Sequence, residues 1–206
     1  MFVADWMTPD PRVIQEDDPI ADAWKLFKDC GFHQMPVVDE VGHLVGIITD
    51  RDVRTAQGFS DRSGEALRAG EVMTSPVETT SLAAPLEDAI RVLASRSFNA
   101  LPVVNKRKLA GIITKNDILK AFCHVLGLDQ AGRCLEVALP SRNGDIVRAF
   151  SAVAACHGQV ISAIVASTRD DRDEISLYLR VAEVEAPAVQ HSLHSAGLIL
   201  LEPEHA

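Results

Sequence analysis

A threonine followed three residues later by an aspartate occurs at two matching places in this chain of 206 residues. Thr49 and Asp52 lie in the phrase GIITDRDV, and Thr114 and Asp117 lie in the phrase GIITKNDI. One interpretation is structural, because a threonine at a helix N-cap and an acidic residue at the third helical position form a capping box. The other is chemical, because a helix N-terminus attracts phosphate and a carboxylate beside it can accept both hydroxyl hydrogens of a ribose. The chemical interpretation predicts a ligand cavity at each of these strand-to-helix corners.

The residues between the threonine and the aspartate differ in charge at the two corners. Arg51 precedes Asp52 and could donate charged hydrogen bonds to a phosphate. At the other corner the matching residue is the neutral Asn116, although Lys115 lies beside it. We therefore expect the cavity beside Arg51 to bind a nucleotide more tightly.

The elements around each corner are repeated as well. Met7-Thr8 matches Met73-Thr74, and HQMPVVD matches NALPVVN. The apolar residues before these strands recur at helical spacing, Ile20, Ala23, Trp24 and Phe27 as Leu86, Ala89, Ile90 and Leu93. The residue pattern of each copy predicts an extended leading segment, a helix, a strand, a tight turn, a second strand and a second helix. A unit of about 55–60 residues is marginally stable alone, so we expect the two copies to pack sheet against sheet.

This ordered set of motifs, occurring twice, resembles a tandem pair of cystathionine-β-synthase (CBS) domains. The resemblance implies an α+β fold with two βαββα repeats, at residues 1–62 and 63–127. In that family the threonine and aspartate hold the ribose and phosphates of adenine nucleotides. Adenine is bound by the residues just before the PVV strand of the opposite repeat.

The resemblance assigns two cavities, each joining a corner of one repeat to a strand start of the other. The first cavity comprises Thr49, Arg51, Asp52, Phe98, Asn99, Ala100, Leu101 and the apolar wall Val77. The second comprises Thr114, Lys115, Asn116, Asp117, Phe32, His33, Gln34, Met35 and the apolar wall Val13. His33 could instead be a satisfied core residue. The sequence does not choose among AMP, ADP and ATP, or exclude S-adenosylmethionine.

Beyond Gly127 the repeat stops, and residues 128–132 are polar enough for a linker. Residues 133–206 predict the order strand, helix, strand, strand, helix, strand, which is that of a ferredoxin-like βαββαβ sandwich, with TRDDRDE as a charged hairpin. This order resembles an ACT domain, a module that often binds amino acids. The typical ACT turn carries an aspartate before Arg-Pro-Gly, whereas Ser141-Arg142-Asn143-Gly144 stands here. Dimerisation without a ligand and amino-acid sensing therefore both remain open, and the CBS-pair-plus-ACT order is similar to that of bacterial acetoin-utilisation regulatory proteins.

Composition limits the partners of the chain. A net charge of −9 and a pI near 5.2 argue against a nucleic-acid partner or an anionic membrane surface. Four scattered cysteines indicate a reduced, cytoplasmic setting. His191 and His194 are spaced like metal ligands, but no third ligand suits them, so we expect no metal.

No arrangement of a nucleophile with a base is evident, so we expect a non-catalytic regulatory protein. It would bind an adenine nucleotide as a regulatory ligand, form a homodimer and act on an unidentified protein target. The rival hypotheses are an enzyme that hydrolyses nucleotides and an assembly module whose cavities stay empty.

Overall fold

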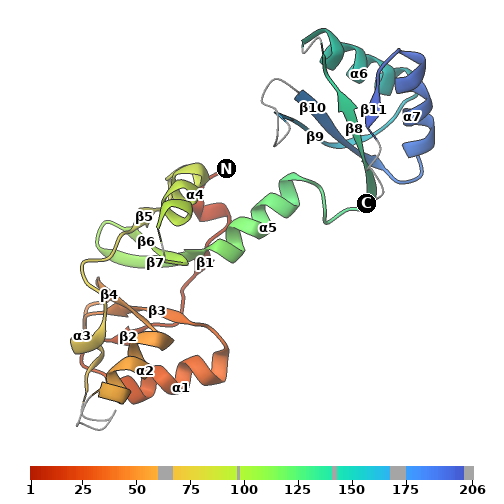
Figure 1. The fold of residues 1–206 in the computed structure, drawn as a ribbon. Coiled ribbons are helices and arrows are strands. Elements are labelled where there is room, and N and C mark those ends of the chain that lie inside the picture. Colours follow the sequence, from red (N-terminus) through yellow and green to blue (C-terminus); the bar gives the residue numbers. More distant parts are fainter. Residues whose placement is uncertain (60–66, 97, 141–142, 168–174, 202–206) are drawn as a thin grey trace. The chain divides into compact units, whose positions relative to one another are not determined.

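The computed structural model describes residues 1–59, 67–96, 98–140, 143–167 and 175–201. These residues form two compact units, Met1–Leu119 and Lys120–Ala206, which we describe separately (Figure 1). The division falls inside helix α5 (Lys115–Val125), earlier than the linker that the sequence suggests at 128–132. In the described ranges, every helix is too short or too polar to cross a membrane.

The first repeat is built as its periodicity predicts. Its elements are β2 (Ile14–Gln15), α1 (Ile20–Cys30), β3 (Gln34–Val38), β4 (Leu44–Thr49) and α2 (Asp50–Phe59). β3 pairs in parallel with β2 and antiparallel with β4. The apolar stripe of α1, Ile20, Ala23 and Phe27, is buried against this sheet, which supplies the core of the repeat.

The second repeat has the same order and the same pairing. Its elements are β5 (Thr80–Ser81), α4 (Leu86–Ser95), β6 (Ala100–Asn105), β7 (Lys108–Thr114) and α5. Val103 pairs with Gly111 here, as Val37 pairs with Gly46 in the first repeat. The two copies therefore share one register, and each ends its last strand at a Thr-x-x-Asp corner.

The turns between the paired strands differ, because the second copy is one residue shorter here than the first. In the first repeat the carboxylate of Asp39 accepts hydrogen bonds from the backbone N–H groups of His43 (2.7 Å) and Val41 (3.1 Å). The bond from His43 is the main cause of a pKa of Asp39 below its ordinary value. In the second repeat Lys106 takes a positive φ of 60° and closes a shorter turn.

The leading segment of each repeat packs on the other repeat. Strand β1 (Thr8–Pro9), which follows the short 3-10 helix η1 (Val3–Asp5), pairs with β7, so that Thr8 lies opposite Ile112. After helix α3 (Ala69–Val72), Thr74 exchanges two backbone hydrogen bonds with Ile47 of β4, at 2.8 and 3.1 Å. The two repeats are thus tied together by an exchange of segments that their sequence boundaries do not reveal.

This exchange explains the glycine that opens both GIIT phrases. A Cβ on Gly111 would lie 2.5 Å from Sδ of Met7 and 2.9 Å from the backbone oxygen of Thr8. A Cβ on Gly46 would lie 2.1 Å from Sδ of Met73. Each glycine leaves room for the methionine of the exchanged segment, so the Met-Thr and GIIT motifs are two halves of one contact.

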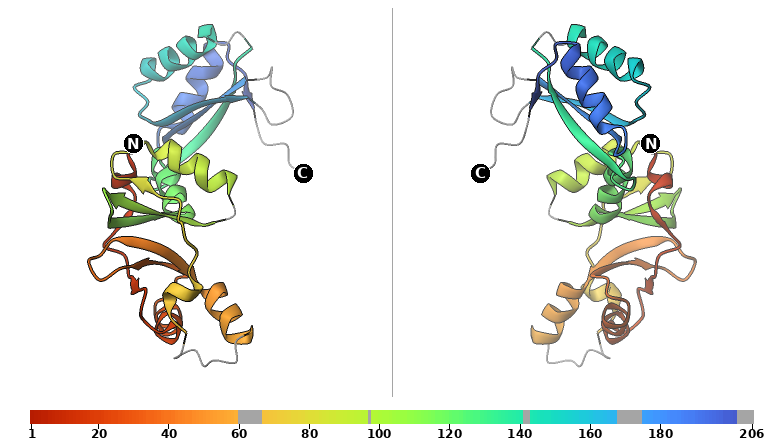
Figure 2. Two further views of the ribbon diagram at one scale, coloured as in Figure 1. Left: turned by 90° about the vertical axis from the view of Figure 1, so that its left-hand side faces the viewer. Right: turned by 90° about the vertical axis from the view of Figure 1, so that its right-hand side faces the viewer.

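The C-terminal unit contains one antiparallel sheet and two helices. In chain order its elements after α5 are β8 (Gly132–Ala138), α6 (Asn143–Ala155), β9 (Val160–Ser167), β10 (Ile175–Ala182), α7 (Ala186–Ser195) and β11 (Leu200–Leu201). The strands lie in the order β11-β8-β10-β9, and α6 and α7 pack on one face of the sheet (Figure 2). Val137, Leu179 and Leu193 are fully buried in the core between them. The charged hairpin at 168–174 and positions 141–142 of the expected ACT turn lie outside the described residues.

Candidate functional site

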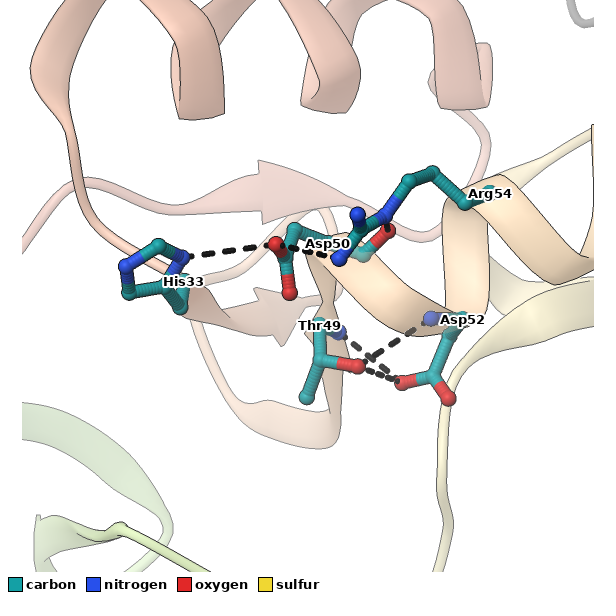
Figure 3. A network of polar contacts seen from close by, with 5 residues as sticks. All are labelled: His33, Thr49, Asp50, Asp52 and Arg54. Atoms are coloured by element: carbon teal, nitrogen blue, oxygen red, sulfur yellow. Dashed lines mark hydrogen bonds and ion pairs between the residues drawn. The ribbon is translucent and has the colours of Figure 1, made fainter.

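Both corners contain the predicted capping box. The backbone N–H and the hydroxyl of Thr49 donate to Oδ2 of Asp52 at 2.9 and 2.6 Å, and the N–H of Asp52 donates to the hydroxyl oxygen of Thr49 at 3.2 Å (Figure 3). Thr114 and Asp117 make the same three bonds at 3.0, 2.7 and 3.2 Å. Because each box fixes its carboxylate at the start of a helix, both corners are preorganised before any ligand arrives.

Replacing Thr49 with alanine should lower the free energy of unfolding of the N-terminal unit by about 1 kcal/mol, because the N-cap oxygen is lost. Both tryptophans, Trp6 and Trp24, lie in this unit, so urea denaturation followed by tryptophan fluorescence reports on it alone. Thr49→Ser keeps the hydroxyl and should remain within a few tenths of a kcal/mol of the wild type. Equal losses in the two variants would show that the methyl group, and not the cap, stabilises the corner.

A cavity of about 350 Å³ opens at the Thr114 corner, and we call it the Thr114 cleft. It is lined by Thr8, Asp10, Pro11, Arg12, Phe32, Gln34, Pro36, Ile112 and Thr114. Three of these, Phe32, Gln34 and Thr114, were predicted for the second cavity. The lining comes from β1 and the segment that follows it, from the start of β3 and from the end of β7. A corner of the second repeat thus faces a strand start of the first.

The other residues predicted for the second cavity do not line this cleft. Met35, between Gln34 and Pro36, is 1% exposed and belongs to the core of the first repeat. Val13 is 38% exposed and is not among the lining residues. In the first turn of α5, Lys115 and Asn116 are exposed to solvent.

His33 points away from the Thr114 cleft and toward the other corner. Its Nδ1 lies 3.3 Å from Oδ2 of Asp50, a carboxylate that also accepts a hydrogen bond from Arg54 at 2.9 Å (Figure 3). The His33 side chain is 80% exposed, so the alternative that it is a buried core residue is wrong. Its backbone oxygen accepts a hydrogen bond from the N–H of Asp50, which anchors the strand start to the helix of its own repeat.

The residues predicted for the first cavity are distributed differently. Phe98 is half-buried and Asn99 is exposed, whereas Ala100 and Leu101 are buried at the start of β6. Val77 lines a second hollow of about 300 Å³, together with Leu44, Val45, Ser75, Pro76, Thr79, Val104, Lys106 and Arg107. This hollow contains neither Thr49 nor Asp52, so it is not the predicted cavity. Arg51 is exposed and lines neither hollow.

Sequence reasoning missed the charged residues that the leading segment brings to the Thr114 cleft. Arg12 is exposed and, within the described part of the chain, makes no hydrogen bond or ion pair. Asp10 lies two residues earlier and takes a positive φ of 44°. Aligning the leading segments of the two repeats could have identified Arg12, because its counterpart in the second repeat is the oppositely charged Glu78.

The cleft can bind a flat, partly polar ligand. Phe32, Ile112 and the prolines offer apolar surface, and Gln34, Thr114 and Arg12 offer hydrogen-bonding groups around it. Among the described residues, no cluster of three or more histidine, cysteine or acidic side chains could hold a metal ion.

Comparison with known proteins gives a family match over both repeats. A profile of the CBS domain matches residues 3–58 and 69–124. The uncharacterised YlbB protein of Bacillus subtilis is 31% identical over 117 residues, which are 56% of this chain and 78% of YlbB. The chain also matches inosine-5'-monophosphate dehydrogenases, but it spans only 27% of the length of the Mycobacterium tuberculosis enzyme.

Two solved structures are similar over the CBS repeats. An acetoin utilisation protein (AcuB) from Vibrio cholerae, described as putative, superimposes with a TM-score of 0.58 and 29% identity, over 63% of this chain and 95% of that one. CBSX2 of Arabidopsis thaliana in complex with AMP gives a TM-score of 0.56 and 29% identity, over 63% and 98% of the two chains.

Proposed function

Because the chain belongs to the CBS-domain family, we propose that it is a non-catalytic regulatory protein that binds an adenine nucleotide in the Thr114 cleft. The observation that carries the proposal is the lining of this cleft. Phe32 and Gln34 of the first repeat and Thr114 of the second border one cavity of about 350 Å³, which is within the usual size range of ligand pockets. The similar CBSX2 structure holds AMP, which supports an adenine nucleotide as the ligand.

The proposed pose follows from the chemistry of the lining. Adenine would lie against the apolar surface of Phe32 and Ile112, with Gln34 available for a hydrogen bond to a ring nitrogen or the amino group. The ribose would meet Asp117 at the corner. The phosphate would lie near the hydroxyl of Thr114 and the first turn of α5, where the helix N-terminus favours a negative charge.

Regulation would arise from the position of the cleft between two repeats. A ligand held by groups from both repeats favours the inter-repeat arrangement in which those groups converge. The resulting shift cannot exceed the difference between the ligand's affinities for the two arrangements. Helix α5 starts at the Thr114 corner and ends within the C-terminal unit, so it is the covalent route by which such a shift would leave the repeats.

For the C-terminal unit we propose an ACT-like module. Its β8-α6-β9-β10-α7-β11 order and antiparallel sheet support this. Dimerisation through the sheet is the simpler role, because β9 is an edge strand of eight residues with one unpaired side. Light scattering after size exclusion, at two protein concentrations, tests the proposed homodimer.

The test of the proposed function is a thermal-shift series with AMP, ADP, ATP, S-adenosylmethionine and adenosine, with GMP as the control. A ligand bound by the folded state raises the melting temperature by mass action, so at least one adenosyl compound should raise it and GMP should not. A flat response to all adenosyl compounds would leave the assembly module as the better hypothesis. Release of phosphate from ATP during the incubation would favour the enzyme instead.

A further inference from the structure

The Thr114 cleft and the Thr49 corner are built from matching residues, so their differences are informative. Ile112 and Thr114 match Ile47 and Thr49, and the aromatic ring of Phe32 matches that of Phe98. The main differences are in charge. Arg12 in the leading segment of the first repeat corresponds to Glu78 in that of the second, and Lys115 in the first turn of α5 corresponds to Asp50 in that of α2.

The Thr114 cleft and the Thr49 corner therefore differ in the charged side chains around them. Arg12 and Asp10 line the Thr114 cleft, and Lys115 and Asp117 lie beside it in the first turn of α5. Arg12 has no ion-pair partner among the described residues, so its guanidinium is available to a ligand without breaking an existing bond.

The matching positions of the Thr49 corner carry more carboxylates, namely Asp50, Asp52 and Glu78. Glu78 lies 4.0 Å from Nε of Arg96, at the limit of an ion pair, and 46% of its side chain is exposed. Asp50 is paired with Arg54, and Arg51 and Asp52 follow it in the first turn of α2. Arg51 extends into solvent from the first turn of α2 and lines neither described hollow.

We propose that Arg12 makes the Thr114 cleft the phosphate-selecting site of the pair, and that Glu78 disfavours phosphate at the Thr49 corner. The chain then binds one adenosine phosphate, at Thr114. This inference rests on the proposed function, and it reverses the expectation that Arg51 marks the tighter cavity. The physical reason is that the leading segment, and not the helix turn, brings the available cation to the cleft lining.

Isothermal titration of the full chain with AMP and with adenosine tests the assignment. Wild type should bind one AMP per chain. Arg12→Gln should weaken AMP about 10-fold or more, the usual effect of losing one charge-assisted hydrogen bond, and should leave adenosine unchanged. The dependence of AMP affinity on salt should also become weaker in this variant.

Arg51→Gln is the matched control, because it removes an exposed cation from the other corner. It should leave AMP affinity unchanged, and Glu78→Arg should raise the stoichiometry of AMP binding toward two per chain.

Equal AMP affinity in wild type and Arg12→Gln, or an equal loss of affinity for AMP and adenosine, would overturn the assignment of Arg12 while the proposed function stands. A wild-type chain that binds AMP, ADP, ATP, S-adenosylmethionine and adenosine all undetectably would overturn the proposed function itself. Fluorescence-monitored melting should give the same temperature for unliganded wild type and Arg12→Gln, since Arg12 is exposed and unpaired.

Discussion

Replacing Gly111 with alanine is expected to lower the free energy of unfolding of the N-terminal unit by about 3 kcal/mol, because the added methyl group overpacks a buried contact. The new Cβ would lie 2.9 Å from the backbone oxygen of Thr8 and 2.5 Å from Sδ of Met7. The methionine can rotate away, but the Thr8 oxygen belongs to β1 and cannot retreat without disturbing its pairing with β7. Urea denaturation followed by the fluorescence of Trp6 and Trp24 measures the loss.

Gly46→Ala is the equivalent change in the first repeat, and it is a control in which the clash should be relieved by a second substitution. A Cβ on Gly46 meets the side chain of Met73, at 2.1 Å from Sδ and 2.7 Å from Cγ. In the Gly46→Ala/Met73→Ala double variant both of those atoms are gone, and the closest remaining contact is 3.1 Å from Cβ of residue 73. Gly46→Ala should therefore cost less in the Met73→Ala background than in the wild type.

A double-mutant cycle separates the two glycines. At Gly111 the cost should persist in the Met7→Ala background, since the clash with the Thr8 backbone remains. Complete recovery by Met7→Ala would show that β1 can shift at little cost, and that the strand exchange is looser than its register suggests.

Local features of the molecule were predictable from the sequence because they arise from residues three or four positions apart. The spacing of Ile20, Ala23 and Phe27 predicted a helix, and α1 buries these three side chains. The types of Thr49 and Asp52 predicted a capping box, and all three of its hydrogen bonds are present. Each of these signals is contained within one or two turns of the chain.

The exchange of leading segments could not be read from such spacing. Thr8 pairs with Ile112, far along the chain, and strand pairing at that separation leaves no local periodicity. Arg12 reaches the Thr114 cleft through the same exchanged segment, so its place there was not visible in the sequence. The sequence prediction therefore chose Arg51, the cation nearest to the Thr-x-x-Asp motif. His33 was assigned to the cavity with its neighbours Phe32 and Gln34, but side chains alternate at the strand start, and His33 faces Asp50.

Removing residues 1–9 is expected to destabilise the second repeat more than the first, although this segment precedes the first repeat in the sequence. The N–H of Val3 donates to the oxygen of Ala84 at 2.9 Å, and the N–H of Leu86 donates to that of Met1 at 3.1 Å. The Val3 side chain is fully buried. Losing these bonds, the β1–β7 pairing and the buried valine together should cost about 4 kcal/mol or more.

Hydrogen exchange with peptide resolution measures the effect where fluorescence cannot, because the truncation also removes Trp6. Amides of β6 and β7 should lose protection first, and those of β3 and β4 should follow only when the unit unfolds as a whole. Matched point variants support the comparison: Val3→Ala should reduce the protection of β7, and Phe2→Ala, at a residue that is 54% exposed, should have little effect.

Earlier loss of protection in β3 and β4 would mean that the leading segment stabilises the repeat it precedes, and that its pairing with β7 contributes little in solution. If the protection of β7 is lost first, the truncation should also disturb the ligand cleft. Thr8, Arg12 and Thr114 line one cavity only while β1 holds its place beside β7, so the truncated chain should lose nucleotide affinity even though Thr114 and Asp117 are retained.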